Sequence, residues 1–135
     1  MVAVISCSHF PDDERIYYRE ISALLEKNYV IKYFTLSDLK TNLSQPGIDH
    51  KNYDSSKVTS AEYLECVEKD LIKEPPKLVH IHEPELFPVA IKMKKLFNTK
   101  IVYDVHEDYI SMIDTFSRLT RPFKNIKIKY WKYKE

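Results

Sequence analysis

The sequence predicts an α/β fold with an open, Rossmann-like parallel sheet and helices on both faces. Short apolar runs of strand length alternate with segments whose apolar residues repeat every three or four positions. Such alternation is expected when each parallel strand is followed by a crossover helix. The chain has 135 residues, 44% of them hydrophobic and 30% charged, which suits one globular domain over residues 1–135.

The chain opens with a strand, a helix and a second strand. Residues 2–5 (VAVI) are continuously apolar, as in a strand covered on both faces. Asp12 or Asp13 can cap the following helix, which should end at Asn28 because asparagine tolerates a left-handed C-terminal cap. Residues 29–36 (YVIKYFTL) are expected to form the second strand.

The next unit begins with a polar segment. Residues 37–58 contain the only glycine and show no period, which predicts a surface loop holding at most a short element. Thr59 and Glu62 have the spacing of a capping box, and the helix that they start should end before Pro75 and Pro76.

Two more strands follow. Residues 77–82 (KLVHIH) predict the third strand, a helix should begin near Pro88, and residues 100–105 (KIVYDV) predict the fourth strand. The remaining tail alternates isoleucine with lysine, yet its apolar residues also share one helical face. We expect a helix from about Leu119.

The net charge of +1 hides an uneven distribution, because residues 118–135 carry seven basic residues and one acidic residue. We expect this segment to be a domain-closing helix. Its lysines and aromatic residues also suit peripheral contact with the inner face of a membrane. Nucleic acid is not expected as a partner, since the remainder of the chain is acidic. Cys7 and Cys66 form no C-x-x-C pair and no signal peptide is apparent, which favours a cytoplasmic protein.

The single glycine, Gly47, excludes two nucleotide-binding motifs. Both the dinucleotide G-x-G-x-x-G turn and the P-loop need at least two glycines close together. We therefore expect no cofactor bound in either way.

Candidate functional residues gather after three of the predicted strands, in segments 8–15, 82–85 and 106–109. Ligands of open parallel sheets bind at the carboxyl ends of the strands. His106 is the preferred catalytic candidate because it ends a strand and is followed by two acids, Glu107 and Asp108, that are costly to bury.

Other readings remain open for several of these residues. His80 suits a sheet-face histidine, whereas His82 at the strand end suits structure and function equally. Arg15 and Glu20 could be a surface ion pair. A metal site of His80, His82, His106 and Asp108 is the less favoured alternative, so no metal is predicted. A nucleophile at Cys7 has only nearby His9 to support it.

Three motifs resemble the N-terminal half of family 4 retaining glycosyltransferases of GT-B fold. The first pattern, His-x-x-x-Asp-x-Arg-Ile-x-x-Lys-Glu, is matched by His9, Asp13, Arg15, Ile16 and Glu20, with Arg19 in the lysine position. The second, His-Asp-Pro-Glu-Leu, appears as residues 82–86 (HEPEL). The third, Tyr-Asp-Val-His-Glu-Asp, is complete at residues 103–108 (YDVHED). Together the motifs cover residues 1 to about 115.

The resemblance implies transfer of a sugar from a nucleotide sugar, linked to UDP or GDP, to a glycan or lipid-linked acceptor with retention. His106 would lie beside the donor sugar. The substrate-binding residues would be His9, Asp13, Arg15, His82, Glu83, Glu85, Glu107 and Asp108.

The chain also departs from this family. The paired-glutamate motif for the donor belongs to a second domain, which 135 residues cannot contain. We therefore expect an N-terminal domain that is incomplete at its C-terminus and inactive alone. The alternative is a non-catalytic binding module that pairs with a separate donor-binding chain. An exposed apolar edge could also support a homodimer.

Overall fold

The computed structural model describes residues 1–105, which contain a five-stranded sheet whose neighbouring strands all run parallel. The strand order is β3-β2-β1-β4-β5. The strands are β1 (Val2–Ile5), β2 (Ile31–Leu36), β3 (Ile48–Tyr53), β4 (Leu78–Ile81) and β5 (Lys100–Tyr103). The predicted α/β fold with an open, Rossmann-like parallel sheet is confirmed.

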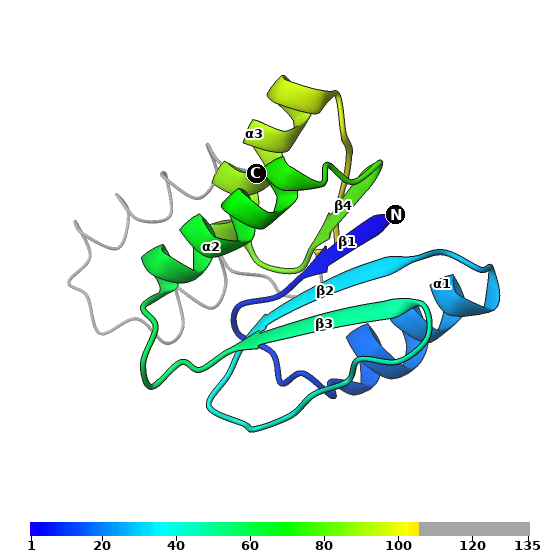
Figure 1. Ribbon diagram of the computed structural model, residues 1–135, viewed down its shortest axis with the longest axis vertical. Coiled ribbons are helices and arrows are strands. Elements are labelled where there is room, and N and C mark those ends of the chain that lie inside the picture. The colour runs from blue at the N-terminus through cyan, green and yellow to red at the C-terminus, as the bar shows by residue number, and fades with distance from the viewer. Residues whose placement is uncertain (106–135) are drawn as a thin grey trace, which may run out of the picture. The chain divides into compact units, whose positions relative to one another are not determined.

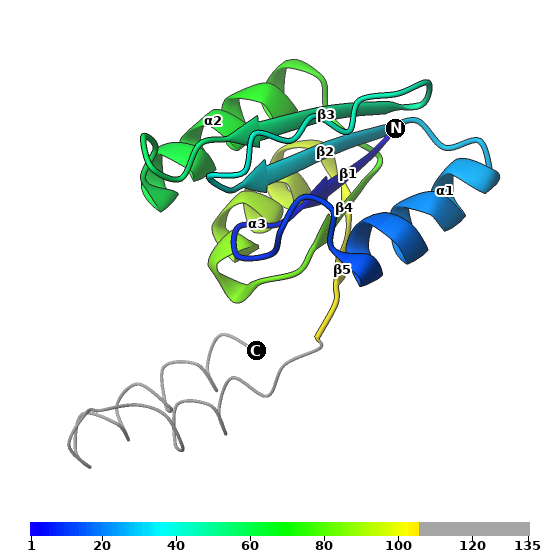
Figure 2. The same ribbon diagram turned by 90° about the horizontal axis from the view of Figure 1, so that it is seen from below.

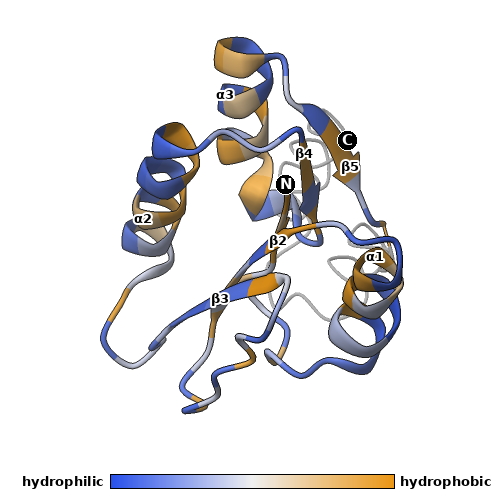
Figure 3. Cartoon of the chain, turned by 45° about the vertical axis from the view of Figure 1, so that its right-hand side comes forward, coloured by the Kyte–Doolittle hydropathy of each residue, from blue (hydrophilic) through white to orange (hydrophobic). Residues whose placement is uncertain are grey.

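Helices cover both faces of the sheet, as Figures 1 and 2 show. One face packs against α2 (Ser60–Lys73) and α3 (Phe87–Phe97), and the other packs against η1 (Glu14–Ile21) and α1 (Ser22–Glu26). In Figure 3, α2 turns its hydrophobic side towards the sheet and its hydrophilic side away from it. The helical faces therefore match the apolar periods of the sequence.

The side chains of β1 alternate between two hydrophobic clusters. Ala3 and Ile5 join the cluster under α2 and α3, whereas Val2 and Val4 join the cluster under η1. Two buried tyrosines have hydrogen-bond partners for their hydroxyl groups: Tyr63 donates to the carbonyl of Ser6 at 2.8 Å, and Tyr33 to that of Pro11 at 3.0 Å. The central strand is thus buried on both sides, as its continuous apolar run predicts.

The first helical segment begins and ends where the sequence predicts. The carboxylate of Asp13 accepts hydrogen bonds from the backbone amides of Arg15 and Ile16. At the other end Asn28 takes the left-handed conformation, with φ of 60°. The residues Glu14–Ile21 form a π-helix, which the apolar period did not reveal.

The segment 37–58 was predicted as a surface loop that can hold a short element, and it contains β3, the edge strand of the sheet, which was not identified as a strand. Its sequence, IDHKNY, has little strand propensity. The ring of His50 is buried, and its Nε2 lies 2.9 Å from the Thr35 hydroxyl on β2. Asn52 accepts a hydrogen bond from the same hydroxyl. Polar side chains with partners across the strand pair therefore replace the expected apolar alternation.

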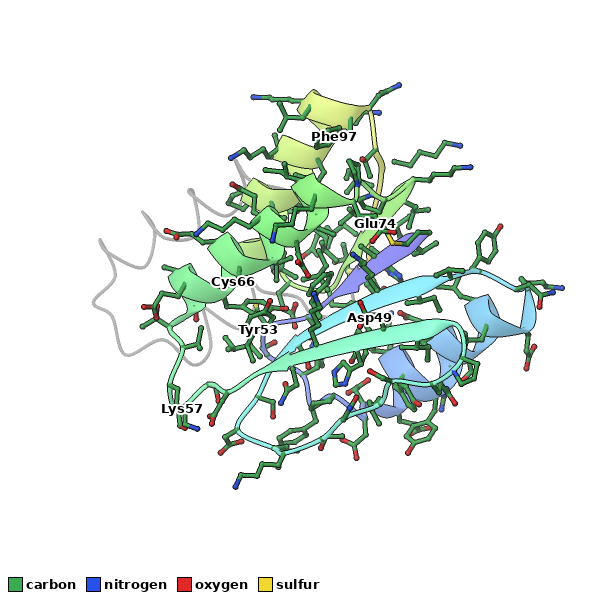
Figure 4. All side chains as sticks on the ribbon, in the orientation of Figure 1. Asp49, Tyr53, Lys57, Cys66, Glu74 and Phe97 are labelled. Atoms are coloured by element: carbon green, nitrogen blue, oxygen red, sulfur yellow. The ribbon has the colours of Figure 1, made fainter. Side chains whose placement is uncertain are left out.

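The remaining elements follow their sequence signals closely. Thr59 and Glu62 form the predicted capping box, and α2 ends at Lys73 before the two prolines. A short 3-10 turn, η2 (Pro84–Leu86), precedes α3. Figure 4 places Lys57 in the connection between β3 and α2, and Cys66 on α2. None of the helices within residues 1–105 is long and apolar enough to cross a membrane. The helix expected from Leu119 and the basic segment 118–135 lie outside the described residues.

Gly47 precedes β3 in a conformation that favours glycine, with φ of 89°. A Cβ atom at this position would lie 2.9 Å from Cδ2 of Leu25. Gly47→Ala is therefore expected to lower the free energy of unfolding by about 1–3 kcal/mol, measured by urea denaturation. Asn28→Gly is the comparison, because glycine adopts the left-handed conformation of residue 28 more readily than asparagine does. This variant should leave the free energy of unfolding unchanged or raise it. Equal stability of Gly47→Ala and the unmutated chain would contradict this account of the turn.

Candidate functional site

The loops after β1 and β4 meet at the carboxyl edge of the sheet, where the strand order reverses. β1 pairs with β2 on one side and with β4 on the other, so the chain winds outward in both directions from this point. Crevices outside such reversal points are the usual ligand sites of open α/β sheets. The residues that follow β1, β4 and β5 are therefore the candidates for a ligand site.

Glu83, the residue after His82 at the end of β4, holds the first loop in place. Its carboxylate accepts hydrogen bonds from the hydroxyls of Ser6 (2.7 Å) and Ser8 (2.9 Å) and from the backbone amides of Cys7 and Ser8 (both 3.1 Å). His9 Nδ1 lies 2.7 Å from the same carboxylate. Because Glu83 is only 1% exposed, this network forms a buried link between the first and second motifs.

The network also explains the acidity of Glu83. Burial by itself would raise the pKa of this carboxyl group, but the hydrogen bonds from His9, Ser6, Ser8 and the Cys7 amide outweigh it. They hold the pKa of Glu83 at about 2. The carboxylate is therefore ionised at every physiological pH.

This low pKa predicts a loss of stability in acid. The folded protein binds the Glu83 proton less tightly than the unfolded chain, whose pKa is near the ordinary value of 4.5. The contribution, about 3 kcal/mol, is present above pH 4.5 and is lost as the pH falls towards 2. Urea denaturation between pH 2 and 6 should show this decline, and Glu83→Gln should flatten it. An unchanged pH profile in that variant would assign the acid sensitivity to other carboxyl groups.

A second polar cluster lies on the other side of His82 and joins η1 to β4 and β5. Arg15 contacts two carboxylates: its Nη2 lies 2.5 Å from Asp104 Oδ1, and its Nε lies 3.4 Å from Glu20 Oε1. The buried ring of His82 lies between the same two acids, with Nε2 3.5 Å from Glu20 and Nδ1 3.6 Å from Asp104. His80 Nδ1 lies 3.8 Å from Glu20.

The π-helical hydrogen bonding of η1 explains why the side chains of Arg15 and Glu20 lie on the same side of the helix. In an α-helix, residues five positions apart point about 140° away from each other. In a π-helix the backbone bonds span five residues, which brings such residues onto one side. Arg19 and Glu14 form a second ion pair with the same spacing. The unusual helix thus presents one cation and one carboxylate together to the ends of β4 and β5.

Charge and burial change the ionisation of this second cluster. Burial and the neighbouring Asp104 raise the pKa of Glu20 to about 7, although Arg15 opposes the change. Burial also lowers the pKa of His80, so its imidazole is neutral at physiological pH. Glu20 can consequently gain or lose a proton near neutral pH, a property common among functional carboxyl groups.

The structure brings together residues from all three sequence motifs. His9, Arg15, His82 and Glu83 lie in the two clusters, Asp13 caps η1, and Glu85 is exposed. Glu107 and Asp108 lie outside the described residues, as does the catalytic candidate His106.

Sequence reasoning missed two members of the second cluster. Glu20 matches the first motif and Asp104 belongs to the third, but neither was predicted as a site residue, and Glu20 could be a surface partner of Arg15. The sequence signal for Asp104 is its place in the third motif directly after β5, and the register of β5 against β4 sets it beside His82. Glu20 could be placed only with the π-helix in view.

Cys7 is held in an unreactive state beside the Glu83 network. Burial, followed by the negative charges of Glu83 and Glu85, raises the pKa of its thiol. The thiolate is the nucleophilic form of cysteine, so this environment disfavours a nucleophile at Cys7.

Two hollows are formed by the described residues, and His80 is the cluster residue that lines one of them. A cavity of about 590 Å³ extends beyond the ends of β2 and β3 and is lined by residues 37–42 and 50–54. A mainly apolar pocket of about 420 Å³ lies on the η1 side of the sheet, where His80 lines it together with Leu24, Leu78 and Val102. The first hollow thus lies at the carboxyl ends of β2 and β3, whereas the second, which Met1, Lys77 and Lys100 also line, lies at the amino ends of β1, β4 and β5.

Comparison of the chain with protein-family models, with curated proteins and with solved structures found no match. The function must therefore be inferred from this chain's own residues. They form an open parallel sheet whose carboxyl edge carries two linked clusters of histidine, arginine and carboxylate side chains.

Proposed function

We propose that this chain is the acceptor-side, N-terminal domain of a retaining glycosyltransferase of GT-B fold. The observation that carries the proposal is the meeting of three motifs that lie far apart in the sequence. His9 of the first motif bonds Glu83 of the second, and Arg15 of the first bonds Asp104 of the third. His82 of the second also lies beside Asp104. Residues that match one family pattern thus form one continuous polar site.

The chemistry of this site suits a sugar with an attached phosphate. Carboxylates and imidazoles bind sugar hydroxyls, because they accept or donate hydrogen bonds without covalent chemistry. Arg15 remains 46% exposed although it contacts two carboxylates, so part of its guanidinium can reach an anionic ligand. The 590 Å³ cavity at the same edge offers room for further sugar units.

In this proposal the reaction needs a second domain that binds the nucleotide sugar. The described residues would hold the acceptor, and His106 would act beside the donor sugar, where it can stabilise developing positive charge or bind a hydroxyl group. The chain alone is expected to bind acceptor without transferring sugar. If it pairs with a separate donor-binding chain, the same site serves as a binding module.

Ligand binding to the 135-residue chain tests this proposal. Nuclear magnetic resonance titrations would use short oligosaccharides and a short-chain lipid diphosphate sugar. We expect amide shifts at Ser8, His9 and Asp104, and at least tenfold weaker binding of the diphosphate ligand by Arg15→Ala. Arg19→Ala is the matched control, since Arg19 is an exposed arginine on the same helix. Absence of shifts with either ligand, or equal effects of the two variants, would contradict the proposal.

A further inference from the structure

Four potential metal ligands converge between η1, β4 and β5. Glu20, His80, His82 and Asp104 each offer one nitrogen or oxygen atom, and these atoms lie within 4.8 Å of one another. We propose that this cluster binds a divalent transition-metal ion of the zinc type. The inference is independent of the proposed sugar transfer, because it depends only on the donor atoms and their positions.

The distances between the donor atoms suit such an ion. Zinc bound at about 2.0–2.2 Å by tetrahedral nitrogen and oxygen ligands separates neighbouring ligand atoms by roughly 3.3–3.6 Å. Glu20 Oε2 lies 3.5 Å from His82 Nε2 and 3.8 Å from His80 Nδ1. Two imidazoles and one carboxylate are a ligand set that zinc accepts at catalytic sites. Small side-chain movements would therefore bring all three atoms to bonding distance.

The fold fixes the directions of these ligands. His80 and His82 lie two residues apart in and just after β4, so both side chains point to the same face of the sheet. Glu20 belongs to the π-helix η1, which packs against that face of the sheet. The three side chains are between 0% and 23% exposed, which leaves the site enclosed but reachable from solvent. Ligands on regular elements hold their geometry better than ligands on loops.

Asp104 is placed to orient His82. Since Nε2 of that ring faces Glu20, the opposite nitrogen Nδ1 faces Asp104 at 3.6 Å. A metal-bound histidine commonly directs its second nitrogen to a carboxylate, which fixes the ring and strengthens its basicity. Asp104 is thus the supporting carboxylate in this site. The fourth position of the ion would be left for water or a substrate oxygen.

Arg15 is the competing cation of the site. Its guanidinium contacts Glu20 and Asp104, so it already neutralises part of their charge. A bound divalent ion and Arg15 would repel each other at this separation. Metal binding should therefore weaken the contacts of Arg15 with the carboxylates, and loss of Arg15 should strengthen metal binding.

Titration of the chain with zinc and cobalt ions tests the proposal. Zinc affinity would be measured by calorimetry at neutral pH, and cobalt would report tetrahedral coordination through its visible absorption. We expect one site per chain. Glu20→Gln and His80→Ala should each weaken binding at least tenfold, and Asp104→Asn should weaken it about 10–100-fold. Glu14→Gln is the matched control. Glu14 lies on the same helix and pairs with Arg19 at the five-residue spacing that also separates Arg15 from Glu20, but it is not among the proposed ligands.

Arg15→Ala separates a metal site from a simple ion-pair network. A metal site predicts tighter zinc binding by this variant, since the competing cation is removed. Thermal unfolding with and without zinc would confirm that each variant folds and would report binding a second time. Absence of the cobalt absorption, or equal zinc affinities of Glu20→Gln and Glu14→Gln, would overturn the proposal.

Discussion

Glu83→Ala is expected to lower the free energy of unfolding by about 3–5 kcal/mol, a large part of the stability of a domain of this size. The carboxylate accepts hydrogen bonds from two hydroxyls, two backbone amides and His9. Its removal leaves these donors without their shared acceptor in a buried place, and each then loses a partner that water cannot readily replace. The loop after β1 should lose its fixed position together with this acceptor.

Glu85→Ala is the control, because Glu85 lies two residues further on in the same motif and is exposed. Urea denaturation should show a change of less than about 0.5 kcal/mol for this variant. Hydrogen exchange at the amides of Cys7 and Ser8 should accelerate in Glu83→Ala only. Similar free energies of unfolding for the two variants would contradict the claim that Glu83 links the first and second motifs.

If the chain acts with a donor-binding domain as proposed, His106→Ala is expected to reduce sugar transfer by at least about 100-fold. Loss of one group that stabilises charge in a transition state costs about two to three orders of magnitude in rate. The fold should survive, since the strands of the sheet and the residues that make up both hydrophobic clusters lie within residues 1–105. Turnover with saturating nucleotide sugar measures the effect, and circular dichroism checks the fold.

Lys92→Ala provides a surface control for the transfer assay, because Lys92 pairs with Glu68 on the outer side of α2 and α3. It should transfer sugar at the unmutated rate. Near-normal turnover by His106→Ala would assign this histidine a structural role and would remove the central residue of the proposed chemistry.

The fold was largely predictable because its elements carry local signals. A continuous apolar run marks β1, a capping box marks α2, and Asn28 marks the end of the first helical segment. β3 was not identified as a strand for a physical reason. As an edge strand it is stabilised by side-chain hydrogen bonds of His50 and Asn52 to Thr35, and such pairing has no periodic apolar pattern.

The location of the candidate site could be predicted from the sequence, but not all of the residues that form it. Parallel strands bring their carboxyl ends to one edge, so the sequence predicted that His9, Glu83 and the residues after β5 would lie near each other. It could not predict that Glu83 would be buried, because its partners are hydroxyls and amides of a distant loop. Nor could it find Glu20, whose direction depends on a π-helix with the apolar spacing of an ordinary helix.

A sugar-transfer assay is the decisive test of the proposed function. The chain, together with the donor-binding domain or chain that the proposal requires, would be incubated with labelled UDP- and GDP-linked sugars and with glycan and lipid-linked acceptors. Label should move to one acceptor class with retained anomeric configuration, and Arg15→Ala should impair this transfer more than Arg19→Ala. A folded protein that transfers no sugar from any of these donors, or that binds none of the acceptors, would contradict the proposed function.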